Sequence, residues 1–252
     1  MDQLRDILNV ATVIQESTLD RESGFATLLS EINETFLALD PLLVQCSGLL
    51  IMFLARTHSA FVASIRLAAS GQGPETFMVL RGAIENALYA IHIKHDPEAF
   101  DRGNAWLGRH IGIREGSRTR QEFTIANVKE SLRRTDEELH RTCQALYDRC
   151  LDLGAHPNQR GHFAASQFSD LDNPEGPEFR SYLFTPRGKI VRFALRSCIE
   201  VGVFALRVFG FVFEERLKLT AMLTDINVLH RDAMVFCQAS ISAEPYEETP
   251  SG

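Results

Sequence analysis

Three ionisable side chains share one stripe of an apolar helix that the sequence predicts over residues 74–94. At about 100° per residue, Arg81, Glu85 and His92 lie together beside an apolar face, with Tyr89 at its edge. Arginine binds anions, and carboxylates and imidazoles exchange protons near neutral pH. The stripe therefore predicts a polar pocket, in which Arg81, His92 and Tyr89 bind a ligand and Glu85 takes part in catalysis.

The same spacing also permits a purely structural interpretation. Arg81 and Glu85 are four residues apart, the separation at which opposite charges form an ion pair on a helix. Charged groups inside a protein usually have such partners, because an isolated buried charge is costly. On the sequence alone, both interpretations stay open.

A second polar group occurs in GAHPNQRGHF, residues 154–163, where a predicted helix ends and a loop begins. Loop residues that a rigid scaffold positions often carry function. We interpret His156 as a catalytic acid or base, because histidine titrates near neutral pH, and Asn158 and Arg160 as ligand-binding residues. Alternatively, these side chains hydrogen-bond the loop or cap neighbouring helices.

The elements that must position these residues are predicted to be helices. Helix starts are indicated by the pairs Asp40-Pro41, Gly73-Pro74, Asp96-Pro97 and Thr185-Pro186, and by the capping box Thr135-x-x-Glu138. The basic stretch 116–121 is predicted to be a loop or a helix break. The sequence thus predicts an all-α bundle of about seven helices, with a small inserted β-hairpin or long loop near 163–185. We expect one helical domain over 1–242, followed by a disordered acidic tail over 243–252.

The composition and the absence of known motifs argue against several classes of protein and site. The five cysteines are odd in number and form no CxxC pair, so we expect neither a disulfide framework nor a metal site. The longest apolar runs, 42–55 and 201–213, are shorter than the ~20 residues of a membrane span. No signal peptide, phosphate-binding loop or dinucleotide motif is visible. We therefore expect a cytoplasmic protein that does not enter membranes and uses no cofactor.

Two features point to partners. The net charge is −7, but the segment 102–134 is basic and is a candidate surface for RNA or another anionic ligand. Apolar helix faces suggest a homodimer, with an aromatic surface supplied by Phe204, Phe209, Phe211 and Phe213. The alternative for these phenylalanines is burial in the core.

The strings LRGAIENALYAIHI…DPEAF and YDRCLDLGAHPN resemble a group of uncharacterised bacterial helical proteins. That group is distantly similar to the HEPN (higher-eukaryote-and-prokaryote nucleotide-binding) superfamily. The resemblance covers about residues 55–163, with Arg81, Glu85 and His156 as the matching positions. It implies a helical bundle, and active members are metal-independent ribonucleases that work as dimers. Their arginine and histidine have their nearest counterparts here in Arg134 and His140.

Our leading hypothesis is a metal-independent binding or regulatory domain with a polar pocket. One alternative is a HEPN-like ribonuclease of a defence or toxin–antitoxin system, in which the basic segment holds phosphate and a histidine activates the ribose hydroxyl. The other is a structural interaction protein without a catalytic site.

Overall fold

The computed structural model describes residues 3–96, 101–110, 112–155, 166–168, 179–185 and 188–242. The all-α prediction is confirmed. In chain order the elements are α1 (Gln3–Arg21), α2 (Ser23–Leu39), the 3-10 helix η1 (Asp40–Leu43), α3 (Gly48–Ala69), α4 (Gly73–Lys94), α5 (Asp101–Gly108), α6 (Ile113–Glu122), α7 (Ile125–Thr135), α8 (Glu137–Cys150), the π-helical turn η2 (Leu151–Ala155), β1 (Ser166–Phe168), β2 (Phe179–Ser181), α10 (Gly188–Val212), α11 (Glu214–Leu217) and α12 (Met222–Ser242).

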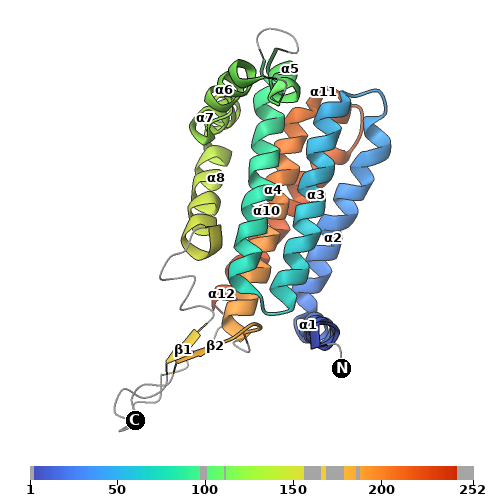
Figure 1. Ribbon diagram of the computed structural model, residues 1–252. Coiled ribbons are helices and arrows are strands. Elements are labelled where there is room, and N and C mark those ends of the chain that lie inside the picture. Colours follow the sequence, from blue (N-terminus) through green and yellow to red (C-terminus); the bar gives the residue numbers. More distant parts are fainter. Residues whose placement is uncertain are drawn as a thin grey trace.

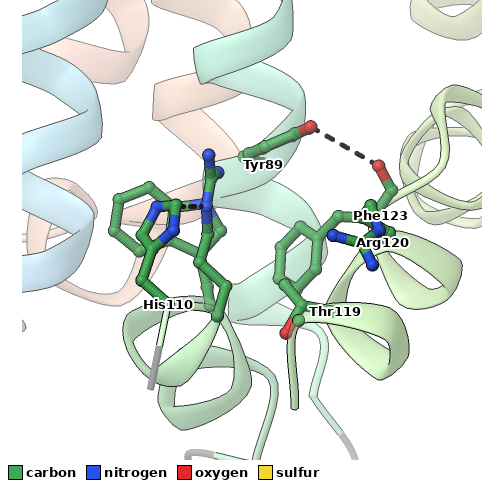
Figure 2. Close-up of a pocket in the computed structure, with 8 residues that line it drawn as sticks. Tyr89, His110, Thr119, Arg120 and Phe123 are labelled. Atoms are coloured by element: carbon green, nitrogen blue, oxygen red, sulfur yellow. Dashed lines mark hydrogen bonds between the residues drawn. The ribbon is translucent and has the colours of Figure 1, made fainter. Parts of the chain in front are cut away.

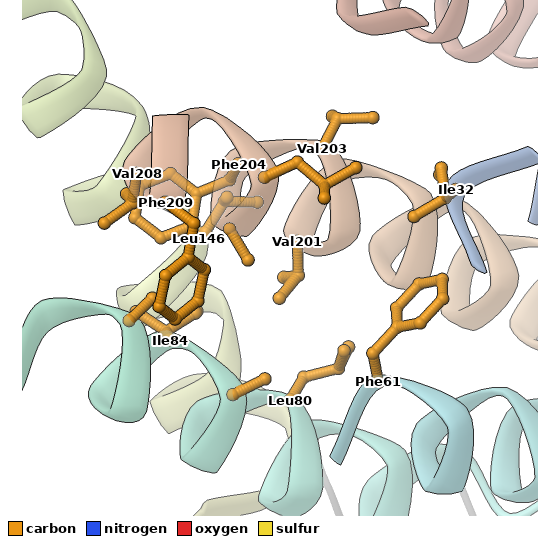
Figure 3. Close-up of a cluster of buried hydrophobic side chains, with 14 of the residues drawn as sticks. Ile32, Phe61, Leu80, Ile84, Leu146, Val201, Val203, Phe204, Val208 and Phe209 are labelled. Atoms are coloured by element: carbon orange, nitrogen blue, oxygen red, sulfur yellow. The ribbon is translucent and has the colours of Figure 1, made fainter. Parts of the chain in front are cut away.

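The core is built around α4 and α10, which are apolar over most of their circumference. Figure 1 shows α2, α3, α4 and α10 side by side as long helices. Side chains from α2, α3, α4, α8 and α10 meet in the centre, where Ile32, Phe61, Ile84 and Phe209 are almost fully buried (Figure 3). Each such side chain contributes about 1.5–3 kcal/mol when it leaves water. This burial fixes α4, and with it the predicted stripe.

The aromatic surface expected to support a homodimer is part of this core. Phe204, Phe209 and Phe213 are buried, and Phe211 is half-buried against the core. The alternative of core packing is therefore confirmed for the buried phenylalanines, because α10 packs against α2, α3, α4 and α12. Phe204, Phe209 and Phe213 are therefore not available as the expected surface, and the homodimer stays a prediction.

Helices α5 to α8 form a separate layer beside α4, with α5 and α6 near one of its ends and α7 and α8 alongside it (Figure 1). The predicted capping box at Thr135 is wrong by one residue. Asp136 caps α8 by accepting a hydrogen bond from the Leu139 backbone N–H at 2.8 Å. Thr135 still belongs to α7, and its hydroxyl donates to the carbonyl oxygen of Ser131.

The described residues contain eleven α-helices, so the predicted number of about seven is wrong. The helix expected from Asp40 onward is interrupted at Gln45, whose φ is +75°, and resumes as α3. The expected break near 116–121 lies inside α6. Gly116 permits a close approach there, because a Cβ atom at this position would lie 2.7 Å from the Arg109 carbonyl oxygen. The final helix is divided into α11 and α12.

Two three-residue strands lie in the segment before α10. Strands β1 and β2 pair in antiparallel fashion, with Ser166 opposite Ser181 and Phe168 opposite Phe179. Most of the rest of 163–185, where a hairpin or long loop was expected, lies outside the described residues, as does the expected tail 243–252. Among the described residues, one helix, α3, is long and apolar enough to cross a membrane by length and composition.

Candidate functional site

The predicted ion pair on α4 is present. Arg81 Nε lies 2.7 Å from Glu85 Oε1, and the two side chains are 30% and 32% exposed. Tyr147 of α8 donates its hydroxyl hydrogen to the same carboxylate oxygen at 3.0 Å. The pair therefore lies at the contact between α4 and α8. Its side chains are more exposed than the apolar composition of α4 predicts.

Lys129 of α7 completes this group, which we call the Tyr147 cluster (Arg81, Glu85, Lys129 and Tyr147). Lys129 Nζ lies 4.0 Å from the centre of the Tyr147 ring and donates to Gln144 Oε1 at 3.0 Å. Burial, followed by the charge of Glu85, raises the pKa of Tyr147 to about 12. The phenol therefore stays protonated and remains a donor at neutral pH. The cluster joins α4, α7 and α8 through groups that already have partners.

His92 lies inside the contact between α4 and α7, with only 2% of its side chain exposed. Its Nδ1 atom is 2.8 Å from the Ser131 hydroxyl. Its Nε2 atom is 3.2 Å from Glu122 Oε1, without the alignment of a hydrogen bond. Burial, followed by the positive charge of Arg102, lowers the pKa of His92 to about 4. The imidazole is therefore neutral at pH 7, so it supplies no positive charge to an anionic ligand.

Arg102 fastens the α5–α6 layer to the end of α4. Its Nη1 atom donates to the carbonyl oxygens of His92 and His95 at 3.0 and 2.9 Å. Its Nε atom donates to Glu122 Oε1 at 2.8 Å, and its backbone N–H donates to Asp96 Oδ2 at 2.6 Å. Carbonyl groups at a helix C-terminus have no partner within the helix and carry partial negative charge. One guanidinium thus holds α4, α5 and α6 together.

A cavity of about 240 Å³ lies between α4, α5 and α6, close to this contact. We call it the aromatic–arginine pocket; its lining consists of Tyr89, Trp106, Arg109, His110, Gly116, Thr119, Arg120 and Phe123. Figure 2 shows Tyr89, Phe123 and Arg120 around it. The rings of Tyr89 and Phe123 meet edge to face at 5.2 Å. The Tyr89 hydroxyl donates to the Phe123 carbonyl oxygen at 3.4 Å, which ties α4 to the end of α6.

Both pocket arginines are exposed, and neither is paired with a carboxylate in the part of the chain that the structure describes. Arg109 Cζ lies 5.9 Å from the centre of the Trp106 ring, and its Nε atom donates to His110 Nε2 at 3.0 Å. The indole N–H of Trp106 is buried and has no acceptor among the described residues. The pocket thus combines aromatic walls with positive charge that no described carboxylate neutralises.

The other described basic side chains of segment 102–134 are engaged elsewhere. Arg102 holds α5 and α6, and Lys129 packs on Tyr147. Arg133 and Arg134 both bind Glu130, at 2.7 and 3.1 Å. Among the side chains of this segment that the structure describes, the exposed arginines without an acidic partner therefore lie at the pocket.

Tyr89 is the predicted site residue that lines this pocket. Arg81 and Glu85 lie further along α4 in the Tyr147 cluster, and His92 lies in the buried contact with Ser131. The three loop residues, His156, Asn158 and Arg160, lie outside the described residues. The sequence marks Arg109 and Arg120 as members of the basic segment 102–134, but nothing in it places them or Trp106 beside Tyr89.

Among the described residues, no group of three or more histidine, cysteine, aspartate or glutamate side chains is arranged to hold a metal ion. Comparison of the chain with protein-family models, with curated proteins and with solved structures gives no significant match. The functional argument therefore rests on the geometry of the pocket.

Proposed function

We propose that this chain is a binding domain that takes a small aromatic anion in the aromatic–arginine pocket. The observation that carries the proposal is the pair Arg109 and Arg120, which lie unpaired with any described carboxylate beside an aromatic wall. Guanidinium groups bind carboxylates and phosphates through directed hydrogen bonds. Unpaired arginines beside a cavity are therefore well suited to an anionic ligand.

The aromatic walls and the volume of the aromatic–arginine pocket indicate the shape and size of the rest of the ligand. Tyr89, Trp106 and Phe123 present aromatic surface, on which a flat ring packs in stacked or edge-to-face geometry. A cavity of about 240 Å³ is smaller than the roughly 300–1,000 Å³ of pockets that hold drug-sized molecules. We therefore assign to it one ring that carries a single phosphate or carboxylate group.

The sequence provides a direct probe, because Trp106 is the only tryptophan of the chain. Titration with phenyl phosphate, benzoate, phenol and inorganic phosphate can be followed by Trp106 fluorescence. We expect the two aromatic anions to change the emission at lower concentrations than phenol or phosphate, since only they satisfy both the rings and the arginines. Equal affinities for phenol and phenyl phosphate would argue against the proposal.

In the ribonuclease alternative the basic segment 102–134 holds phosphate and a histidine activates the ribose hydroxyl, and Arg134 and His140 are the nearest counterparts of the superfamily's arginine and histidine. Arg134 binds Glu130 on its own helix, and no hydrogen bond joins Arg134 to His140 within the described ranges. Ribonuclease activity stays a prediction from the HEPN resemblance, since no described contact favours it. RNA cleavage in the presence of EDTA, with His140→Ala and His156→Ala as comparisons, tests it.

A further inference from the structure

A second cavity, of about 220 Å³, lies between α8, α10 and α12 and shares no lining residue with the aromatic–arginine pocket. Helix α10 packs against both α8 and α12, whereas no close packing joins α8 to α12 in the part of the chain that the structure describes. The surface of α10 between the two helices is therefore the floor of this cavity, and α8 and α12 are its walls. We call it the aliphatic pocket.

Most of the surface of the aliphatic pocket is hydrocarbon. Leu139 and Leu146 of α8 and Val203 and Phe204 of α10 are buried, and Met234 of α12 is half-buried. Leu146, Val203 and Phe204 also belong to the core cluster in Figure 3, so the pocket opens onto the core. Four of these five side chains are aliphatic. The walls therefore suit a flexible hydrocarbon chain better than a flat ring, which gains most from aromatic neighbours.

One end of the pocket carries an excess of positive charge. Arg149 lines this end and donates from Nη1 to Glu200, which also lines it, and to the Ser197 hydroxyl at 3.1 Å. Arg196 Nε lies 3.9 Å from the other oxygen of the same carboxylate and has no hydrogen-bond acceptor among the described residues. Both guanidinium groups pack on the Phe193 ring, at 5.4 and 4.9 Å from its centre. Two positive charges thus share one negative charge, and each side chain is 25% exposed or less.

The rest of the lining does not neutralise this charge. Glu200 is the one carboxylate among the lining residues. His230 of α12 lines the pocket as well, and burial, followed by the positive charge of Arg207, lowers its pKa. The imidazole is therefore neutral at pH 7. The nearby carboxylate of Asp136 is paired with Arg207 at 3.4 Å.

We infer that the aliphatic pocket binds a medium-chain aliphatic carboxylate, with its chain along the leucines and Met234 and its carboxylate at Arg149. The described contacts of Arg149 use only its Nη1 atom, and a guanidinium has five N–H donors, so donors are left for a ligand. An excess of charge in a partly buried place is unfavourable until an anion neutralises it. This site is independent of the aromatic–arginine pocket and of the function proposed for it.

NMR of methionine methyl groups tests the inference on the full chain. Met234 lines the pocket, and Met78, 53% exposed on α4, is an internal reference. The ¹³C-labelled protein is titrated with octanoate, butyrate, 1-octanol and octylamine, and Met234→Leu assigns the resonance. We expect octanoate to shift Met234 and leave Met78 unchanged. Each methylene is worth about fourfold in affinity, so butyrate should bind roughly a hundredfold more weakly. Without a negative charge, 1-octanol should bind about tenfold more weakly or less well still, and octylamine should not bind.

Two substitutions separate a binding site from a structural ion pair. Glu200→Gln removes the carboxylate that competes for the arginines, so it should tighten octanoate binding by about threefold or more. Ala145 lies at the rim of the pocket and is exposed, so Ala145→Phe should fill the entrance without disturbing the core. We expect it to weaken octanoate binding by about tenfold or more. Ala55→Phe, at an exposed position of α3, is the matched control and should bind as the native chain does.

Three results would overturn the inference: no shift of Met234 with octanoate, equal binding of octanoate and octylamine, or unchanged binding by a folded Ala145→Phe variant. Weaker octanoate binding by Glu200→Gln would overturn it as well. Circular dichroism checks that each variant is folded. Arg109→Gln/Arg120→Gln should leave octanoate binding unchanged, so failure at one pocket is distinguishable from failure at the other.

Discussion

The Nε atom of Arg102 lies 2.8 Å from Oε1 of Glu122, and this contact joins the first turn of α5 to the last turn of α6. The same guanidinium binds the last carbonyl groups of α4. The two helices that carry Arg109 and Arg120 are thereby held against the helix that carries Tyr89. Arg102 therefore supports the pocket without lining it, together with the hydrogen bond from the Tyr89 hydroxyl to the Phe123 carbonyl oxygen.

Replacement of Arg102 by lysine should weaken the pocket. A lysine keeps the charge but lacks the planar fork that reaches Glu122 and two carbonyl oxygens at once. We expect a loss of about 1–3 kcal/mol in the free energy of unfolding, measured with urea, and weaker binding of phenyl phosphate. Arg133→Lys is the control, because Arg133 binds Glu130 on the exposed side of α7. Unchanged binding by Arg102→Lys would show that the pocket forms without this contact.

The stability of the protein should fall in mild acid. In the folded state burial lowers the pKa of His92 from its ordinary 6.5 to about 4, so the folded protein binds this proton less readily than the unfolded chain does. Above pH 6.5 His92 is neutral in both states and does not change the free energy of unfolding. As the pH falls from 6.5 to about 4, the free energy of unfolding decreases by about 3 kcal/mol in total. Burial lowers the pKa of His58, His95 and His230 as well, so their effects have the same sign.

Urea unfolding at closely spaced pH values measures this dependence. His92→Gln should flatten the curve between pH 6.5 and 4, because glutamine at this position does not titrate, whereas His92 has a lowered pKa. His58→Gln serves as the comparison and should flatten it less, since His58 is only half-buried. An equally steep curve for His92→Gln and the native chain would contradict the assignment.

Removal of the Arg81–Glu85 pair should have a modest effect. The sequence suggests a buried pair, whose disruption would cost several kcal/mol. About a third of each side chain is exposed, so solvent screens the interaction. We expect Arg81→Ala to lower the free energy of unfolding by about 1 kcal/mol. A loss as large as that of a buried pair would show that Glu85 and Tyr147 depend on Arg81 more than their geometry suggests.

Two glycines provide a paired test of the contact between η2 and α4. A Cβ atom on Gly154 would overlap the carbonyl oxygen of Pro74, whereas one on Gly82 would meet nothing within 4 Å. Gly154→Ala should therefore destabilise the protein by about 3 kcal/mol, as overpacking against a backbone atom does. Gly82→Ala should stabilise it by about 0.5–1 kcal/mol, because alanine favours a helix interior. In thermal unfolding, the melting temperature should therefore fall for Gly154→Ala and rise for Gly82→Ala.

The sequence correctly predicts features that depend on residues close together in the chain. The spacing of Leu80, Ile84 and Leu88 predicts the buried face of α4, and the four-residue separation of Arg81 and Glu85 predicts their contact. Gly73-Pro74 marks the start of α4 correctly. These features depend on side chains within a few residues of one another, whose relative positions follow from helix geometry alone.

The surroundings of His92 and the pocket depend on distant partners. His92 is buried because Ser131, 39 residues later, packs over it, and no local pattern indicates that contact. The pocket forms only because α5 and α6 return to the end of α4, so that Trp106 and Arg120 approach Tyr89. The sequence shows the positive charge in 102–134. It does not show that Arg133 and Arg134 pair with Glu130, whereas Arg109 has no carboxylate partner among the described residues.

The most direct test of the proposed function compares phenyl phosphate binding by the native chain and by Arg109→Gln/Arg120→Gln, with Trp106 fluorescence as the readout. Removal of two charge-assisted contacts should weaken binding by roughly a hundredfold, while Arg133→Gln should leave it unchanged. Equal binding by the native chain and the double variant would contradict the account, as would an absence of binding to the native chain.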